Sequence, residues 1–357
     1  MATVNAGEDD AQGMTFTRLF TAWLASENCA LAIATDLPTG LCMVGRQKDG
    51  KVMFQAVGEA SYSALAIGDG GAVWAAEKNF LWKWENITET GGYQADGARL
   101  YAPRARIFTS DLGTRDMAVD GNGSLLLASG AYSVVGRATP EASFETVWKP
   151  PFITAISRED RCGLSGLGLY DQERHCVTMW GRSDKPHGWK NNFDGGGCVM
   201  LIHDSSILCE GLCLPRAPRW RGEDLYLLNA GTAEFGRVDR DRNCFVPICQ
   251  CPGYPTGLAF VRQWAVVSVS SSAPAVMEGL DLPATASFAA RKVSPFSGLL
   301  LIDLATGDIA HHAYGESEGF TVSGVAVLPG CPLAMAITSG SDKLDALVTV
   351  PRRNSRA

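Results

Sequence analysis

Arginine, serine and threonine side chains stand at the beginnings of several short apolar runs in this 357-residue chain. Guanidinium groups bind carboxylate or phosphate through paired hydrogen bonds, so these arginines would form an anion site if the fold brought them together. The residues of this predicted binding set are Arg115, Asp116, Arg161, Ser165, Arg216, Arg219, Asn229 and Thr256. The alternative is that the arginines pair with Asp116, Asp160 and Glu234 and only tie the structure together.

A second polar segment, residues 181–197, combines Ser183, Asp184 and Trp189 with several glycines. Such a composition is typical of a binding loop, and it adds Ser183 and Trp189 to the predicted ligand contacts. The alternative is a loop without a ligand, whose Trp189 packs on a neighbouring part of the protein.

Few residues indicate catalysis. Glu234 and Asp184 are the carboxylates that could act as a general base. The sequence contains no Gly-x-Ser-x-Gly, His-Glu-x-x-His, phosphate-loop or dinucleotide motif. The tightest cysteine groups, Cys249 with Cys251 and Cys209 with Cys213, lack the paired spacing of a structural zinc site. We therefore expect neither a metal nor another cofactor.

Charge and hydropathy limit the partners. With 31 basic and 38 acidic residues the net charge is -7, which argues against a phosphate-neutralising surface for nucleic acid. No apolar run approaches the roughly 18 residues that cross a bilayer. The acidic beginning of the chain does not resemble a signal peptide, and eleven cysteines favour a reducing compartment. We expect a soluble, cytoplasmic protein with neither nucleic acid nor membrane as a partner.

A short phrase recurs along the chain roughly every 50 residues, and this repetition indicates the elements that position the polar side chains. A small or polar residue precedes an apolar, strand-like run, a tight turn and further strands. The copies lie around Leu65, Met117, Leu167, Trp220, Leu258 and Val325. A strand, a turn and three more strands are the pattern of a β-propeller blade.

Six copies predict an all-β chain with a single six-bladed propeller over residues 28–350. The strands of residues 30–57 would complete the last blade and close the ring. If they formed a blade of their own, the propeller would have seven. The first strand of each blade lines the central channel, so the polar residues that open the phrases are predicted to meet at its mouth.

Three segments lie outside this pattern. Residues 1–27 form an N-terminal extension in which Met14 to Ser26 predicts an amphipathic helix, with Phe16, Leu19, Phe20, Trp23 and Leu24 on one face. Residues 273–291 indicate an inserted loop or short helix. Residues 351–357 are a basic tail that we expect to be solvated.

Several phrases of the chain together resemble one family. They include Phe20-Thr21-Ala22-Trp23-Leu24, Trp148-Lys149-Pro150-Pro151-Phe152-Ile153, Glu159-Asp160-Arg161-Cys162, Pro218-Arg219-Trp220, Leu228-Asn229-Ala230-Gly231-Thr232 and Cys251-Pro252-Gly253-Tyr254. Over about residues 15–335 the chain resembles the DUF4915 family of uncharacterised proteins. The resemblance implies a propeller-like fold and no established activity.

The departures from that family concern histidines. Its members typically carry a histidine, then a histidine with an asparagine, and then another histidine at places where this chain has Arg115, Gly163 with Ser165, and Arg216. If those histidines hold a metal in relatives, this chain has lost it. We therefore expect a non-catalytic binding or scaffold protein that holds a small anion or a peptide at the channel mouth. The alternative is a lactonase-like hydrolase or lyase that uses a channel carboxylate.

Overall fold

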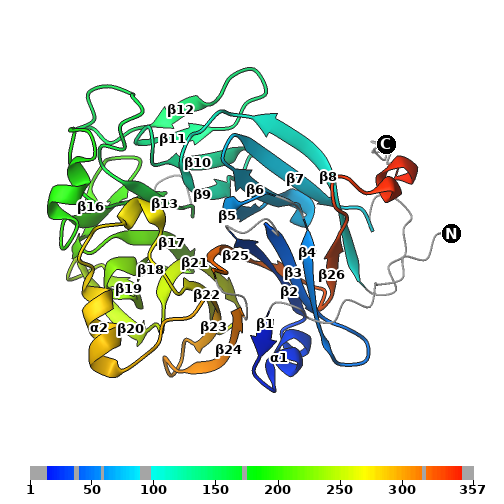
Figure 1. The fold of residues 1–357 in the computed structure, drawn as a ribbon. Helices are drawn as coiled ribbons and strands as arrows, with labels where there is room; N and C mark the ends of the chain where they lie inside the picture. Colours follow the sequence, from blue (N-terminus) through cyan, green and yellow to red (C-terminus); the bar gives the residue numbers. More distant parts are fainter. Residues whose placement is uncertain are drawn as a thin grey trace.

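The structure is a computed structural model that describes residues 14–35, 40–57, 60–88, 98–170, 175–315 and 319–347. Six sheets are arranged around a common axis, with one strand of each nearest the centre (Figure 1). The chain is therefore a six-bladed β-propeller, as the repeated phrase predicts. The basic tail at 351–357 lies outside the described residues.

The blades are numbered here in chain order of their innermost strands, and each is given from the centre outward. Blade 1 contains β5 (Tyr62–Ile67), β6 (Val73–Glu77), β7 (Phe80–Asn86), β8 (Arg99–Phe108) and β26 (Ala334–Ala336). Blade 2 contains β9 (Thr114–Val119), β10 (Leu125–Ser129), β11 (Val134–Arg137) and β12 (Glu145–Trp148). Blade 3 contains β13 (Leu164–Gly168), β14 (Cys176–Met179), β15 (Gly197–Leu201) and β16 (Ile207–Leu212).

The second half of the ring continues the same plan. Blade 4 contains β17 (Pro215–Arg221), β18 (Asp224–Asn229), β19 (Glu234–Asp239) and β20 (Cys244–Gln250). Blade 5 contains β21 (Tyr254–Val261), β22 (Trp264–Ser270), β23 (Gly298–Asp303), β24 (Ile309–Gly315) and β1 (Met14–Phe16). Blade 6 contains β25 (Val322–Pro329), β2 (Cys29–Thr35), β3 (Leu41–Arg46) and β4 (Val52–Val57). The repeat positions Leu65, Met117, Leu167, Trp220, Leu258 and Val325 all lie on innermost strands, as predicted.

Blade 6 closes the ring with strands from both ends of the chain. Its innermost strand β25 pairs antiparallel with β2, and the register places Ile33 opposite Val325. Residues 30–57 therefore complete the last blade and do not form a seventh. This pairing leaves no free inner strand edge where the ring joins.

The N-terminal segment differs from the prediction of one continuous helix. Met14–Phe16 form β1, which pairs antiparallel with β24, and only Phe20–Ser26 form the helix α1. The strand prevails at the start because the outer edge of blade 5 offers backbone partners to this segment. Phe20, Trp23 and Leu24 are buried between blades 5 and 6, whereas Leu19 is 58% exposed.

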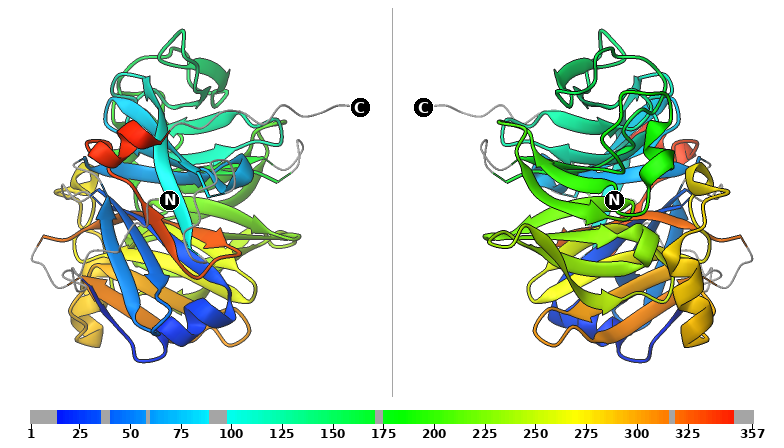
Figure 2. Two further views of the ribbon diagram at one scale, coloured as in Figure 1. Left: turned by 90° about the vertical axis from the view of Figure 1, so that its right-hand side faces the viewer. Right: turned by 90° about the vertical axis from the view of Figure 1, so that its left-hand side faces the viewer.

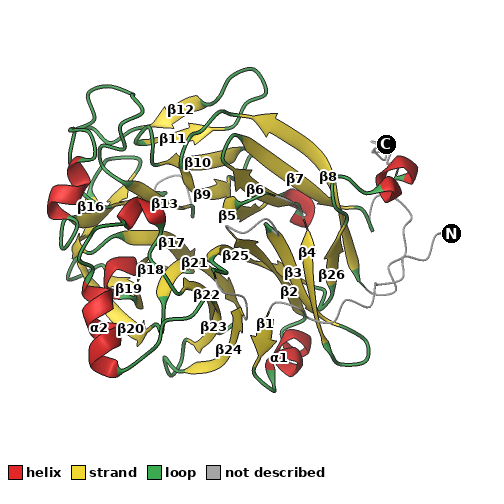
Figure 3. Ribbon diagram, viewed as in Figure 1, coloured by secondary structure: helices red, strands yellow, loops and turns green. Residues whose placement is uncertain are grey.

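The helical segments lie in the connections between strands, except the last one, Asp342–Ala346, which follows β26 (Figure 3). The insertion predicted at 273–291 contains the short 3-10 helix η4 (Ala275–Met277) and the helix α2 (Pro283–Arg291). Both side views place α2, coloured gold, at one face of the ring (Figure 2). The other short 3-10 helices are η1 (Asp69–Gly71), η2 (Gly188–Asn192), η3 (Ala230–Thr232) and η5 (Asp342–Ala346). Among the helices of the described residues, none is long and apolar enough to span a membrane.

The core lies between adjacent blades, where the apolar faces of neighbouring sheets meet. All eleven cysteines are free thiols, and ten of them are buried. Burial raises the pKa of Cys29, Cys162, Cys176 and Cys198 to about 12. These thiols are therefore protonated at neutral pH and act as small apolar side chains of the core.

Candidate functional site

A cavity of about 480 Å³ opens where the first residues of five innermost strands meet. The strands β5, β9, β17, β21 and β25 provide its floor, and the loop between β22 and α2 provides one wall. The cavity is lined by Ser63, Thr114, Arg115, Trp180, Arg216, Thr256, Ser270, Ser272, Ala273, Pro274, Ala275, Val276, Met277, Gly319, Thr321, Val322 and Ser323. This mouth cavity brings together three members of the predicted binding set: Arg115, Arg216 and Thr256.

Below the mouth cavity the channel is narrow. The free volume there is about 20 Å³, enough for about one water molecule. Five residues line both spaces and so mark the floor of the mouth cavity: Ser63, Arg115, Arg216, Thr256 and Ser323. Asp116 and Arg219 line only the narrow part. They are therefore beneath the floor and not in the mouth cavity.

Asp116 and Arg219 form a two-point ion pair across blade 3. Arg219 Nη1 and Nη2 donate to the two carboxylate oxygens of Asp116 at 2.8 and 2.7 Å. Between them, Leu167 N donates to Asp116 Oδ2 at 3.0 Å, and Arg219 Nη1 donates to Leu167 O at 3.1 Å. The pair thus joins the innermost strands of blades 2, 3 and 4. Arg219 therefore pairs with a carboxylate and joins blades, as the alternative to an anion site predicts.

The serines that open the repeated phrases join neighbouring blades. Each donates its hydroxyl hydrogen to a backbone carbonyl at the start of the next innermost strand, in the pairs Ser323 to Tyr62, Ser63 to Thr114 and Ser165 to Pro215. Ser165 is fully buried and does not line the mouth cavity. The recurring hydroxyl therefore has a structural reason, because it satisfies a carbonyl where two blades meet.

Arg115 lines the mouth cavity but is also held from behind by Asp160. Its Nη1 and Nη2 donate to the Asp160 carboxylate at 3.0 and 2.6 Å, and Nη1 also donates to Leu164 O at 3.2 Å. The guanidinium carbon lies 4.0 Å from the ring centroid of Trp180. These contacts fix the plane of the guanidinium at the edge of the cavity.

Arg216, Thr256 and Thr321 are further polar residues of the mouth lining. Arg216 is buried and lines both the mouth cavity and the narrow channel. Thr256 Oγ1 shares a hydrogen bond of 2.8 Å with Ser268 Oγ. Thr321 Oγ1 is buried and has no hydrogen-bond partner among the described residues. A buried hydroxyl without a partner is unfavourable, and because Oγ1 has almost no accessible surface it does not face a ligand in the cavity.

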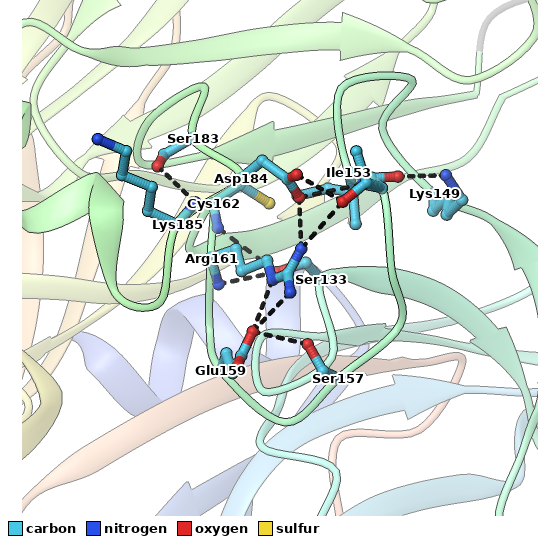
Figure 4. A network of polar contacts seen from close by, with 11 residues as sticks. Ser133, Lys149, Ile153, Ser157, Glu159, Arg161, Cys162, Ser183, Asp184 and Lys185 are labelled. Atoms are coloured by element: carbon cyan, nitrogen blue, oxygen red, sulfur yellow. Dashed lines mark hydrogen bonds and ion pairs between the residues drawn. The ribbon is translucent and has the colours of Figure 1, made fainter.

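Arg161 lies outside the mouth cavity, which corrects the prediction that four arginines gather there. Its Nε donates to Glu159 Oε2 at 2.7 Å, and its Nη1 donates to Asp184 Oδ1 at 2.6 Å (Figure 4). Thr154 donates to the same Asp184 carboxylate through N and Oγ1. Arg161 is in the loop before β13, where Gly163 turns the chain with a φ of 63°. This network joins the 154–161 and 182–190 loops.

Acid should loosen this loop network. Hydrogen bonds from Thr154 and then Arg161 lower the pKa of Asp184 from 3.8 to about 2. Because the folded pKa is below the unfolded one, the stabilisation is complete above about pH 4 and is lost as the pH falls through about 2. Hydrogen exchange of residues 150–162 is expected to rise over this range relative to the Asp184→Asn variant at the same pH. An identical pH response in that variant would contradict the assignment.

Neither Asp184 nor Glu234, the two carboxylates considered as general bases, lies at the mouth cavity. A carboxylate with a pKa of about 2 accepts protons poorly at neutral pH, which disfavours Asp184. Glu234 Oε2 accepts hydrogen bonds from Thr232 Oγ1 at 2.6 Å and from Asn229 Nδ2 at 3.4 Å. Asn229 Oδ1 in turn accepts from Cys213 N at 2.8 Å. Asn229 and Glu234 thus hold the turn between β18 and β19 and do not line the mouth cavity.

In the 181–197 loop, Trp189 packs against a neighbouring part of the protein, which is the alternative to a ligand-binding loop. Trp189 is 1% exposed, and its ring centroid is 4.5 Å from that of Trp180. Ser183 Oγ accepts a hydrogen bond from Lys185 N within the loop. Neither residue lines the mouth cavity, so the structure does not place them where the sequence analysis expected ligand contacts.

Sequence reasoning did not identify Trp180, Thr321 and the 272–277 segment as parts of the mouth. Trp180 directly follows an apolar strand, which is equally typical of a core residue. The segment belongs to an insertion that no other blade repeats, so the repeat pattern could not place it over the channel. Within the described part of the chain, no group of three or more His, Cys, Asp or Glu side chains could hold a metal ion.

The chain belongs to the DUF4915 family: residues 18–337 match its profile, described as a domain of unknown function. No curated protein sequence matches the chain. A nidogen/laminin complex contains a similar structure, with a TM-score of 0.56 and 12% identity over 85% of this chain and 99% of that chain. A protein of unknown function from Bacteroides caccae has a TM-score of 0.51 and 11% identity over 84% and 99% of the two chains.

These similarities establish the propeller fold alone, because the identities are so low. An inactive virginiamycin B lyase from Staphylococcus aureus, crystallised with quinupristin, has a TM-score of 0.41 and 10% identity. The match covers 84% of this chain and 97% of the lyase chain. That level of similarity bears on neither activity nor ligand.

Proposed function

We propose that this protein is a non-catalytic binding propeller that holds a small anion in the mouth cavity. The observation that carries the proposal is the charge of the cavity. Its described lining residues include Arg216 and also Arg115, whose charge is balanced by Asp160 outside the cavity, and they include no carboxylate. In a chain of net charge -7, such a lining favours a negatively charged ligand.

The polar groups of the mouth suit this role. Arg115 is fixed by Asp160 and Trp180, so its remaining N–H groups have a defined direction. Ser63, Ser270 and Ser323 already donate their hydroxyl hydrogens to backbone carbonyls, so Thr114, Thr256 and Ser272 remain as the neutral donors of the lining. A volume of about 480 Å³ is in the range of small-molecule sites. These features support a small anion over an extended peptide.

The chemistry of the lining favours binding over the hydrolase or lyase alternative. Among the described residues that line the cavity there is no His, Asp, Glu, Cys or Lys. General acid–base catalysis most often uses these residue types. Glu234 and Asp184, which could have served as bases, are held in contacts elsewhere.

Arg216 provides the test. Thermal-shift and calorimetric titrations with phosphate, citrate and sugar acids are expected to identify an anion that stabilises the protein. Arg216→Gln should weaken its binding by about 1.5–3 kcal/mol, the value of a hydrogen bond to a charged group. Arg216→Lys, which retains the charge, should weaken it less.

Two controls make the test specific. Arg240→Gln removes a half-exposed arginine of blade 4 outside the cavity and should leave binding unchanged. Thr321→Val removes a hydroxyl that is buried away from the cavity and has no partner among the described residues, so it should leave anion binding unchanged and should not lower the melting temperature. The proposal is wrong if no anion binds, or if Arg216→Gln and Arg240→Gln bind equally well.

A further inference from the structure

The mouth cavity has two chemically different sides. The floor consists of Ser63, Arg115, Arg216, Thr256 and Ser323, which are all polar or charged. The wall above it is the continuous apolar segment Ala273-Pro274-Ala275-Val276-Met277. A ligand that fills the cavity would therefore contact guanidinium and hydroxyl groups at one end and apolar atoms at the other.

The apolar wall is built into the fold. Met277 N donates to Pro274 O at 2.8 Å, and Glu278 N donates to Ala275 O at 3.0 Å, which closes the short helix η4. Met277 is buried in a cluster that also contains Trp180, Tyr254 and Phe288 of α2. Ala273 and Val276 pack against this cluster and are only partly covered. Their uncovered atoms face the cavity that they line, and a preformed wall of this kind costs little ordering when a ligand binds.

We infer that the ligand is an organic carboxylate with an apolar body, bound with its carboxylate on the floor and its body against the 273–277 wall. This inference rests on the proposed function, because it assumes that the floor binds an anion. Guanidinium groups match the planar carboxylate with paired hydrogen bonds. Burial of an apolar body in contact with Pro274 and Val276 supplies the additional affinity, since affinity grows with the apolar area removed from water.

Four probes separate the two parts of the inference. They are 3-phenylpropanoate, propanoate, the neutral 3-phenylpropanamide and inorganic phosphate, each titrated calorimetrically into the full-length protein. The phenyl compound is expected to bind about 10- to 100-fold more tightly than propanoate, as the burial of an aromatic ring predicts. The amide should bind at least 10-fold more weakly than the acid, because it lacks the charge. Phosphate should bind more weakly than the phenyl acid.

A matched pair of variants tests the wall itself. Val276→Ser, in the wall, should weaken 3-phenylpropanoate about 3- to 10-fold and leave propanoate unchanged. Val147→Ser makes the same change on the outermost strand of blade 2, where Val147 is exposed, and should alter neither.

Each outcome decides between the two proposals. Equal affinities for 3-phenylpropanoate and propanoate, or tighter binding of phosphate, would overturn the apolar body and leave the anion site standing. Equal affinities for the acid and its amide would overturn the anion site. If none of the four probes binds, the inferred carboxylate ligand is wrong, and the titrations with citrate and sugar acids then decide whether the anion site stands.

Discussion

Replacing Asp116 by alanine is expected to lower the free energy of unfolding by about 3–5 kcal/mol. The substitution leaves Arg219 in the narrow channel without its carboxylate and removes the acceptor of Leu167 N. Three blades would lose the contact that joins their innermost strands. Urea unfolding followed by tryptophan fluorescence would measure the change.

A matched control is available on the surface. Asp224 pairs with Arg237 at 3.8 Å, and both side chains are about half exposed. Asp224→Ala should therefore cost less than about 1 kcal/mol. The double replacement Asp116→Ala with Arg219→Met should recover part of the loss, because it removes the uncompensated charge. A similar loss at Asp116 and Asp224 would contradict the structural role given to the channel pair.

Replacing Gly257 by alanine is expected to destabilise the propeller by about 1–3 kcal/mol. A Cβ atom on Gly257 would lie 2.8 Å from Gly324 Cα and 2.9 Å from Val325 N. These are backbone atoms of the neighbouring innermost strand, so relief requires blades 5 and 6 to move apart. Thermal unfolding of the purified variant would measure the effect.

Gly121→Ala is the matched control for this substitution. Gly121 lies in the turn between β9 and β10, and a Cβ there would meet no atom within 4 Å. The same added methyl group should therefore change stability by less than about 1 kcal/mol. Equal melting temperatures for the two variants would show that the innermost strands have room to adjust.

The close contacts around Gly257 also bear on why the sequence phrase repeats. Gly166, Gly257 and Gly324 stand at the same place in three copies, on innermost strands. At Gly166 a Cβ would lie 2.3 Å from Pro218 Cδ on the next innermost strand. At Gly166 and Gly257 the backbones of neighbouring blades approach too closely for a Cβ, whereas a Cβ on Gly324 would meet no atom nearer than 3.9 Å. At the first two positions the recurring small residue thus reflects the close packing of innermost strands, so the repeated phrase predicts the fold better than it predicts a ligand.

The sequence predicts one helix from Met14 to Ser26, and the structure confirms only its second half. The residues from Met14 to Ser26 have apolar side chains at helical spacing, and Phe20, Trp23 and Leu24 do form the buried face of α1. Met14–Phe16 instead extend blade 5, since β24 presents its outer edge to them. Local periodicity does not contain this information, because the competing partner is a strand about 300 residues away in the chain.

The sequence by itself indicated six innermost strands, and it left open whether residues 30–57 complete the last blade or form a seventh, which the pairing of β2 with β25 decides. Repetition and strand periodicity are local patterns, so they are legible without knowledge of distant contacts. It also placed Arg115, Arg216 and Thr256 at the channel mouth, because each stands at the start of an innermost strand.

Only the tertiary structure decided which arginines pair with carboxylates and which line the cavity. Arg115 meets Asp160 and Arg219 meets Asp116, pairs separated by 45 and 103 residues. Arg161 turns to Glu159 and Asp184, and Trp189 packs on Trp180. Whether an arginine faces a carboxylate or a cavity depends on distances of a few ångströms between different blades, since ionic hydrogen bonds act only at that range. The spacing of residues along the chain does not specify those distances.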